Sequence, residues 1–456
     1  MNRLPGRCAT ILPLLALLLC GFRTTQTPTH RLSIPVIATA APAYDALAAL
    51  RGGERFPRGA QLLLIENGGA ALLVHGFAAS ADASVSFDAQ RVLFAGKKTA
   101  GDAWAIWELT LSDHSVRKVI GGAQDMVRPI YLPGDRLVYG RRTQKGFQLE
   151  SASLDGSGPL PLSYAPGSAL PDDVLSDGRI LFESMFPLGE GNTPEMFLVY
   201  SDGSGVESYR CDHGEARWGG RQLASGDVVF THGPRLARFT SPSAHEVNVA
   251  APRAEYAGAI EALESGDWLL SARQSSKTAY ALEQWTPGAA ELRAFYSRAG
   301  ENLVEPALLA PRQRPNKHPS ALHQWTYGNL LAIDARESRL GDLNKLPARV
   351  QMETLDENGK PVVLGTAPVA GDGSFFVAAP GDRPIRFALL DAGGAAVRRQ
   401  RGWFWIRSGE QRVCVGCHTG PERSFENRVP GVLLITTTPA DLTGAAMRGP
   451  FEEPTR

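Results

Sequence analysis

Short apolar segments separated by turn residues recur along the chain between about residues 60 and 340. Each repeat has a strand, a turn containing Gly or Asp, and a second strand rich in β-branched and aromatic residues, as in residues 173–182. The second strands carry anchors separated by 45, 43, 48 and 40 residues, namely Phe94, Tyr139, Phe182, Phe230 and Leu270. A period of about 40 to 50 residues with four strands per unit predicts the blades of a β-propeller.

Five repeats are complete, and a sixth can be assembled from the two ends of the repeat region. Residues 61–65 and 71–74 would supply its first strands, and residues 328–334 its last. Pairing them in one blade would close the ring and remove exposed strand edges. We therefore expect six blades, with five or seven as alternatives. The Asp-Gly and Gly-Asp turns resemble the TolB-like and WD40-like repeats of exported bacterial proteins, which implies a propeller but no particular activity.

The period-2 alternation of apolar and polar residues continues beyond residue 340, where the blade spacing stops. Residues 349–355 and 361–364 flank Asn358-Gly359, the strongest short signal for a hairpin. Further strands are expected at residues 374–378, 385–390 and 402–406. The sequence therefore predicts an all-β chain, with a six-bladed β-propeller followed by a small β-sandwich domain.

The expected domain organisation follows from these patterns. It comprises a signal peptide at residues 1–30, a linker at 31–58, the β-propeller at 59–340, the β-sandwich at 341–430 and a C-terminal tail at 431–456. The first segment has basic residues followed by a short apolar core, which is typical of a secretory signal and too short to span a membrane in the mature protein. We therefore expect a periplasmic or otherwise exported protein.

Cys20 follows the apolar core of this signal and is a candidate for acylation, which would anchor the protein to a membrane as a lipoprotein. The preceding residue, Leu19, is larger than the small residue expected before such a cysteine. Simple removal of the signal peptide is the alternative.

Composition excludes several classes of partner. Lys and Arg together number 47, as do Asp and Glu, so the chain has no basic excess for nucleic acid or for anionic lipid. No other apolar run reaches the length of a transmembrane helix. The 48 glycines and 32 prolines indicate many short connections, as in an all-β chain. We expect no nucleic-acid partner and no transmembrane span in the mature chain.

The sequence Cys414-Val-Gly-Cys417-His418 has the spacing of a c-type haem attachment site. Two thiols three residues apart add to the haem vinyl groups, and the next imidazole then becomes the proximal ligand of the iron. The alternatives are a structural disulfide, a zinc half-site or a thioredoxin-like redox pair. A zinc site lacks a second ligand pair nearby, and no strand–helix unit of thioredoxin type surrounds the motif. We expect one covalent haem c, carried on a loop because Gly and Pro follow the motif.

Other residues are candidates for the surroundings of the haem. His318 and His323 lie just before the β-domain, and either is a candidate distal ligand to the iron. Arg412 and Arg428 flank the motif and could pair with the haem propionates, with surface salt bridges as the alternative. The aromatic residues 403–405 could supply an apolar wall for the haem or ordinary core.

Four segments of the second domain together resemble proteins related to the hydrazine synthase alpha subunit. They are Gly371-Asp-Gly-Ser-Phe-Phe-Val377, Leu390-Asp-Ala-Gly393, the run from Arg401 to His418, and Glu426-Asn-Arg-Val-Pro430. The resemblance implies a propeller joined to a haem-bearing β-domain. The alpha subunit carries two c-type haems, whereas this chain has one attachment motif, so the resemblance does not carry hydrazine synthesis over directly.

These features allow functions of different classes. The first is an exported monohaem c-type cytochrome that transfers electrons in the cell envelope, with a periplasmic redox protein such as another cytochrome as its partner. It requires a second strong ligand to the iron. The alternative is a haem enzyme that acts on small nitrogen or oxygen compounds and resembles hydrazine synthase, which requires an open distal face. A propeller binding module with a structural haem is a third reading. The absence of a paired His/Asp or Glu constellation near the motif favours electron transfer.

Overall fold

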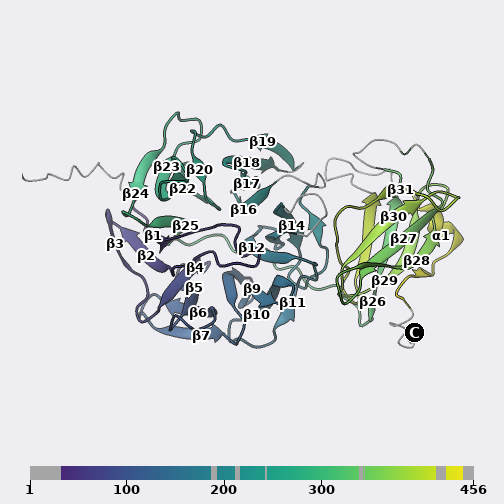
Figure 1. Cartoon of the computed structure of the whole chain (residues 1–456), viewed down its shortest axis with the longest axis horizontal. Coiled ribbons are helices and arrows are strands. Elements are labelled where there is room, and N and C mark those ends of the chain that lie inside the picture. The colour runs from purple at the N-terminus through teal and green to yellow at the C-terminus, as the bar shows by residue number, and fades with distance from the viewer. Residues whose placement is uncertain are drawn as a thin grey trace, which may run out of the picture.

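The computed structural model describes residues 32–185, 193–210, 216–241, 244–337, 343, 345–416 and 428–444. It has two β-domains side by side, a propeller built from the first part of the chain and a sandwich built from the last part (Figure 1). Cys20, Cys417 and His418 lie outside the described residues. Among the residues described, no helix is long and apolar enough to span a membrane.

The propeller has six sheets, one for each blade, and this confirms the six-bladed prediction. The first blade contains β25 (Asn302–Leu308), β1 (Val36–Ala41), β2 (Gln61–Glu66) and β3 (Gly69–Leu72). The second contains β4 (Ala79–Val85), β5 (Arg91–Lys97), β6 (Ala105–Thr110) and β7 (Val116–Ile120). The third contains β8 (Met126–Leu132), β9 (Arg136–Thr143), β10 (Gly146–Ser153) and β11 (Leu160–Pro161).

The other three blades follow the same antiparallel order. They contain β12 (Ser168–Val174), β13 (Ile180–Met185), β14 (Glu195–Val199) and β15 (Glu207–Ser208); β16 (Arg217–Gln222), β17 (Val228–His232), β18 (Arg235–Thr240) and β19 (His245–Asn248); and β20 (Glu255–Tyr256), β21 (Glu261–Ala262), β22 (Trp268–Arg273), β23 (Ala281–Trp285) and β24 (Arg293–Tyr296). In the last blade β20 and β21 both pair with β22, so its innermost strand is interrupted.

The predicted anchors of the repeats occupy one equivalent place. Each lies on the second strand of its blade and is at most 1% exposed, on β5, β9, β13, β17 and β22. A large apolar side chain at this place packs between neighbouring sheets, which explains why the same residue type recurs with the period of the blades.

The ring closes as expected in principle but with a different strand. β25 pairs antiparallel with β1, and this places residues 302–308 and 36–41 in the same blade. The predicted closing segment, residues 328–334, instead belongs to β26 (Tyr327–Asp334) in the second domain. The predicted linker, residues 31–58, contributes β1 to the propeller. The alternation of a strand marks it as a strand but does not specify the sheet it joins.

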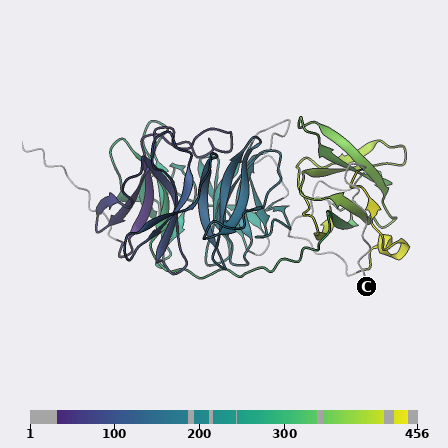
Figure 2. The same cartoon turned by 90° about the horizontal axis from the view of Figure 1, so that it is seen from below.

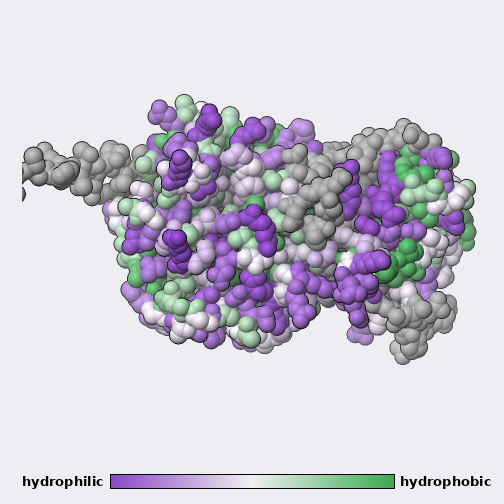
Figure 3. Space-filling model, in the orientation of Figure 1, coloured by the Kyte–Doolittle hydropathy of each residue, from purple (hydrophilic) through white to green (hydrophobic). Residues whose placement is uncertain are grey.

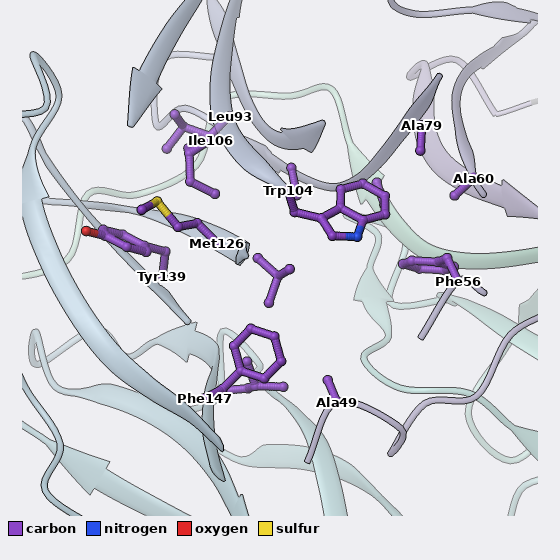
Figure 4. Packing of buried hydrophobic residues seen from close by; sticks show 14 of the residues in the cluster. Ala49, Phe56, Ala60, Ala79, Leu93, Trp104, Ile106, Met126, Tyr139 and Phe147 are labelled. Atoms are coloured by element: carbon purple, nitrogen blue, oxygen red, sulfur yellow. The ribbon is translucent and has the colours of Figure 1, made fainter. Parts of the chain in front are cut away.

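Residues 42–58, between β1 and β2, cover one end of the propeller. Ala49 and Phe56 belong to a buried cluster that also contains Trp104 and Phe147 from the second and third blades. Figure 4 shows these side chains facing one another. The segment is therefore part of the propeller core, held by burial of apolar surface.

The second domain is a sandwich of two four-stranded sheets, as predicted. One sheet has the order β32 (Gln411–Gly416), β26, β29 (Phe375–Pro380) and β33 (Ala440–Asp441). The other has the order β28 (Pro361–Pro368), β27 (Arg349–Leu355), β30 (Ile385–Leu390) and β31 (Ala396–Arg399). A short helix, α1 (Gly431–Ile435), and β33 come from the predicted tail, so this segment also belongs to the domain. The Asn358-Gly359 turn joins β27 to β28 with Gly359 at φ 76°, as the hairpin signal indicated.

A segment of residues 309–326, which we call the strap, connects the two domains. In Figure 2 it runs along one face of the propeller to the sandwich. Its backbone is tied down where the Arg312 N–H donates to Phe87 O at 3.0 Å and the Asn316 N–H donates to Ser176 O at 2.9 Å. The strap therefore follows the turns between the first and second strands of the blades.

Trp405 fixes the sandwich on the propeller. It is 1% exposed and belongs to a hydrophobic cluster of the propeller, where its ring lies 6.3 Å from that of Phe182 and 6.2 Å from that of Tyr164. Its Nε1 donates a hydrogen bond of 3.0 Å to Gly203 O. A buried tryptophan with a satisfied N–H is a strong anchor, so the two domains pack as one unit.

The surface differs between the domains. The face of the propeller seen in Figure 3 is largely hydrophilic with scattered apolar residues, whereas green patches gather on the sandwich. Exposed large apolar residues of the sandwich include Val362, Val363, Leu434 and Ile435.

Candidate functional site

A cavity of about 950 Å³ lies between the two domains. The propeller contributes Phe197, Leu198 and Val206 to its wall, and the sandwich contributes Phe387 and Leu389. Its volume falls at the upper end of the range of about 300–1,000 Å³ that is usual for small-molecule and cofactor sites. Docking of the sandwich on the propeller therefore creates a candidate site of the size that a cofactor needs.

Cys414 lies in the wall of this cavity, on β32. β32 runs parallel to β26, with Cys414 opposite Ala332. The predicted loop is therefore a strand up to Gly416, because the alternation in Arg412-Val-Cys-Val-Gly416 pairs with the exposed edge of β26. Burial raises the pKa of the Cys414 thiol, which keeps it protonated at neutral pH.

The alternation along β32 gives its two faces different roles. Arg412 and Cys414 are half-buried, whereas Val413 is 60% and Val415 is 40% exposed. Apolar side chains on an edge strand usually have a partner. Cys417 and His418 follow Gly416 directly in the sequence, outside the described residues.

Both histidines that we predicted as candidate distal ligands line the same cavity as Cys414. The His318 ring stacks on Tyr200 with a centroid distance of 3.9 Å. The His323 ring stacks on Trp325 at 4.4 Å, and its Nε2 lies 3.3 Å from Gln411 Nε2. The strap thus brings two imidazoles to the cavity, each oriented by a neighbouring aromatic ring.

Of the two arginines predicted to meet haem propionates, only Arg412 lines the cavity. Its Nε donates to Glu410 Oε1 at 3.0 Å and its Nη1 to Trp405 O at 3.3 Å. Its Nη2 is buried and has no hydrogen-bond partner among the described residues. A buried guanidinium N–H without an acceptor is costly, so this nitrogen is suited to an anionic group of a ligand.

Arg428 lies elsewhere. Its Nη1 donates to Asp372 Oδ2 at 2.5 Å and its Nη2 to Asp372 O at 3.1 Å, with Asp334 Oδ2 at 3.5 Å. Arg428 is therefore engaged in an ion-pair cluster of the sandwich, which corresponds to the salt-bridge alternative.

The aromatic residues before the motif divide their roles. Trp403 and Phe404 line the cavity, and the Arg386 guanidinium lies 4.5 Å from the Trp403 ring centroid. Trp405 faces the propeller core instead. The predicted strand over residues 402–406 is irregular, with a single bridge between Ile385 and Phe404. In a regular strand Trp403 and Trp405 would share one face and Phe404 would lie on the other. The irregular backbone instead allows Trp403 and Phe404 to line the same cavity while Trp405 faces the propeller.

Glu410 is a residue that sequence reasoning missed. Its Oε1 accepts from the Gly205 N–H at 3.0 Å, and its Oε2 accepts from the Arg407 N–H at 2.8 Å. It holds Arg412 at the cavity while joining the sandwich to the propeller. No spacing pattern announces such a residue, because its partner Gly205 lies 205 residues away in the chain.

The comparisons with known proteins agree with this architecture. Residues 343–419 match the family model of the hydrazine synthase alpha subunit middle domain. The structure is similar to that of Kuenenia stuttgartiensis hydrazine synthase, with a TM-score of 0.76 and 15% identity over 90% of this chain and 72% of that chain. TolB from Acinetobacter baumannii has a TM-score of 0.48 and 13% identity over 62% of this chain and 68% of its own. No curated protein matches the sequence.

At 15% identity the likeness to hydrazine synthase shows the fold, and it spans both domains. The family match covers most of the sandwich and includes the whole attachment motif. The resemblance recognised in the sequence is thus confirmed: residues 343–419 match the middle domain of the hydrazine synthase alpha subunit, and the two-domain fold is similar to that of hydrazine synthase.

Proposed function

We propose that this chain is an exported haem c protein of the hydrazine synthase alpha type, and that it acts as a haem enzyme on small nitrogen or oxygen compounds. The observation that carries the proposal is the position of Cys414 in the wall of the interdomain cavity of about 950 Å³. The match of residues 343–419 to the hydrazine synthase alpha subunit middle domain supports the same class of chemistry.

The residues of the cavity fit a haem. Its wall is largely apolar and aromatic, which suits a porphyrin ring, and it includes Phe375, Phe387 and Phe404. The unpartnered Nη2 of Arg412 suits a propionate. Haem, when bound, supplies a redox-active iron.

In this proposal the residues of the attachment motif and of the cavity wall have separate roles. Cys414 and Cys417 would hold the porphyrin through thioether bonds, and His418 would be a ligand of the iron. Arg412 orients a propionate, and Glu410 holds Arg412 in place. The apolar wall limits the access of water and so influences the reduction potential.

Electron transfer is the second candidate function. It is favoured by one observation, the presence of His318 and His323 in the wall of the same cavity. If either imidazole were a second ligand of the iron beside His418, the haem would supply electron transfer to a periplasmic partner and would not bind a substrate. If neither binds, the distal face is open to small molecules.

Attachment is tested by expressing the full chain in a host with haem-attachment machinery. We expect a covalent haem that survives acid–acetone extraction in the wild type and is lost or bound through one thioether in Cys414→Ser and Cys417→Ser. Cys211→Ser, outside the motif, is the matched control and should keep its haem. A full complement of doubly attached haem in Cys414→Ser would contradict the proposal.

The two functions are separated by optical and EPR spectra with added CO, NO or hydroxylamine. An open site predicts high-spin iron that binds these molecules. Low-spin iron that does not bind CO, NO or hydroxylamine, and that becomes high-spin in either His318→Ala or His323→Ala, would support the electron-transfer function and reject the enzymatic one. In both cases Arg412→Gln should shift the reduction potential while retaining covalent haem.

A further inference from the structure

A second cavity, of about 570 Å³, lies on the axis of the propeller, and residues from all six blades line it. It contains Asp82 and Arg128 from the second and third blades, Asp172 from the fourth, Arg221 from the fifth and Glu305 from the first. None of these residues belongs to the cavity between the domains. The central channel of this propeller is therefore lined by charged side chains.

The backbone around the channel is arranged to present these side chains. The innermost strands are bulged, with register shifts between Ala81 and Ser84 on β4 and between Val127 and Ile130 on β8. Asp82, Arg128 and Glu305 have φ values of 61°, 53° and 56°. The left-handed conformation is strained for a non-glycine residue, and such residues are concentrated at functional sites.

On one side of the channel the charged groups pair with one another. Arg55, whose side chain is 4% exposed, pairs with Asp82 and Glu305. Burial raises the pKa of Glu305 to about 7; Arg55 opposes the rise and Asp82, which is in hydrogen-bonding contact, adds to it. Burial therefore favours the protonated form of Glu305, whereas the charge and hydrogen bond of Arg55 outweigh the effect of burial on Asp82 and lower its pKa. Glu305 Oε2 has no hydrogen-bond partner among the described residues.

The adjoining wall is also satisfied. Arg128 pairs with Glu183 and, at 2.9 Å, with Asp172. The second oxygens of these carboxylates accept from the Gly219 and Gly220 N–H groups, both at 3.2 Å. The acceptors of this part of the channel thus already have donors.

The remaining side of the channel, toward the strap, has hydrogen-bond donors without acceptors. Trp218 Nε1 and Arg221 Nε are buried donors without an acceptor among the described residues. Arg312, on the strap, also lines the cavity. Within the described part of the chain no carboxylate lies within 4.0 Å of its guanidinium, whereas Arg221 has Asp173 at 3.3 Å and Glu261 at 3.2 Å. On this side of the cavity the unmet hydrogen-bonding capacity therefore belongs to donors.

Arg312 is held there by contacts that leave its N–H groups available. Its guanidinium lies over the Phe87 ring at 4.7 Å, and its backbone N–H donates to Phe87 O at 3.0 Å. Burial lowers the pKa of Arg312, and the nearby charge of Arg221 lowers it further, against the opposing effect of Asp173. Two guanidinium groups close together in a low-dielectric cavity gain most from an anion between them.

We propose that the propeller channel binds a small monovalent oxyanion, held by Arg312, Arg221 and the indole N–H of Trp218. A planar carboxylate or an inorganic oxyanion such as nitrate presents the acceptors that these donors lack. A dianion is disfavoured because six carboxyl groups line the same cavity beside four guanidinium groups, namely Asp82, Asp172, Asp173, Glu183, Glu261 and Glu305 beside Arg55, Arg128, Arg221 and Arg312. The site is independent of the haem proposal.

The test is calorimetric titration of the full chain with sodium formate, acetate, nitrate and sulfate, with sodium chloride at matched ionic strength. We expect formate, acetate or nitrate to bind at a single site and the dianion sulfate to bind at least tenfold more weakly. Preference for the carboxylates or for nitrate would identify the source of the oxyanion. Arg312→Gln should weaken binding at least tenfold, and Trp218→Phe, which keeps an aromatic side chain but removes the N–H, should weaken it severalfold.

Arg314→Gln is the matched control. Arg314 is on the same strap and also faces Phe87, at 5.9 Å, but it is exposed and does not line the cavity. It should bind like the wild type. Absence of binding beyond the chloride control, or equal loss in Arg312→Gln and Arg314→Gln, would overturn the proposal. Neither Arg312 nor Arg314 forms an ion pair with another described residue, so circular dichroism of both variants should show the wild-type fold.

Discussion

Replacement of Trp405 by alanine should uncouple the two domains. The side chain is 1% exposed, packs among propeller residues such as Phe182, and donates to Gly203 O at 3.0 Å. Truncating a buried tryptophan costs about 3–5 kcal/mol, and loss of the hydrogen bond adds about 1 kcal/mol. Trp405→Phe keeps most of the packing and should cost about 1–2 kcal/mol.

The loss falls on the interface, so the shape of the unfolding transition is as informative as its midpoint. We expect the wild type to unfold in one calorimetric transition and Trp405→Ala to show two, with faster proteolysis of the strap. Trp285→Ala is the matched control, because Trp285 is also 1% exposed but lies in the last blade of the propeller. It should destabilise the propeller without separating the domains.

The same variant tests whether the interdomain cavity depends on docking. The cavity has walls from both domains, so Trp405→Ala should also retain less haem than Trp405→Phe. A single transition at the wild-type midpoint in Trp405→Ala would refute the reasoning, because a side chain that anchors two domains cannot be removed without a change in their coupling.

Three further predictions concern single positions. Burial raises the pKa of Glu305 from 4.5 to about 7, so its contribution to stability is complete below pH 4.5 and is lost as the pH rises through 7. The difference corresponds to about 3 kcal/mol. In urea titrations, the free energy of unfolding should fall less between pH 5 and pH 8 in Glu305→Gln than in the wild type. A Cβ at Gly328 would lie 2.1 Å from Ile406 Cγ2, so Gly328→Ala should lower the free energy of unfolding in urea by about 1–3 kcal/mol. A Cβ at Gly371 would meet nothing within 4 Å, so this clash should not destabilise the control Gly371→Ala. Burial raises the pKa of Asp372, but hydrogen bonds from hydroxyl, backbone and guanidinium groups lower it far more. Its contribution to stability is therefore present above pH 4 and is lost as the pH falls. Asp372→Asn should lower the melting temperature at pH 7, and the difference in melting temperature between this variant and the wild type should be smaller near pH 2.

The propeller was readable from the sequence because its core has a period. The anchors from Phe94 to Leu270 recur where a large apolar side chain must fill the space between sheets. β1 was missed because Val36–Ala41 precedes the repeats and its partner β25 lies more than 260 residues along the chain. The segment 328–334 was recognised as a strand and assigned to the propeller, because local alternation is the same in either domain.

The candidate site shows the same division between local and distant information. Cys414 was found from the spacing of a motif, and the alternation around it also marks the strand β32 that the loop prediction overlooked. The other wall of the cavity was not predictable. Tyr200 and Glu410 acquire their positions from docking of the sandwich on the propeller, which no short stretch of sequence records.

Closure of the first blade by β25 has a consequence for biogenesis. A chain that emerges from its N-terminus exposes the unpaired edge of β1 until residues 302–308 have followed. For most of its synthesis the chain is therefore an open arc of blades with one unpaired strand edge, and such edges can pair with strands of other molecules. We expect truncations that end before residue 302 to aggregate, and chaperones that shield such borders to be needed until the ring is complete.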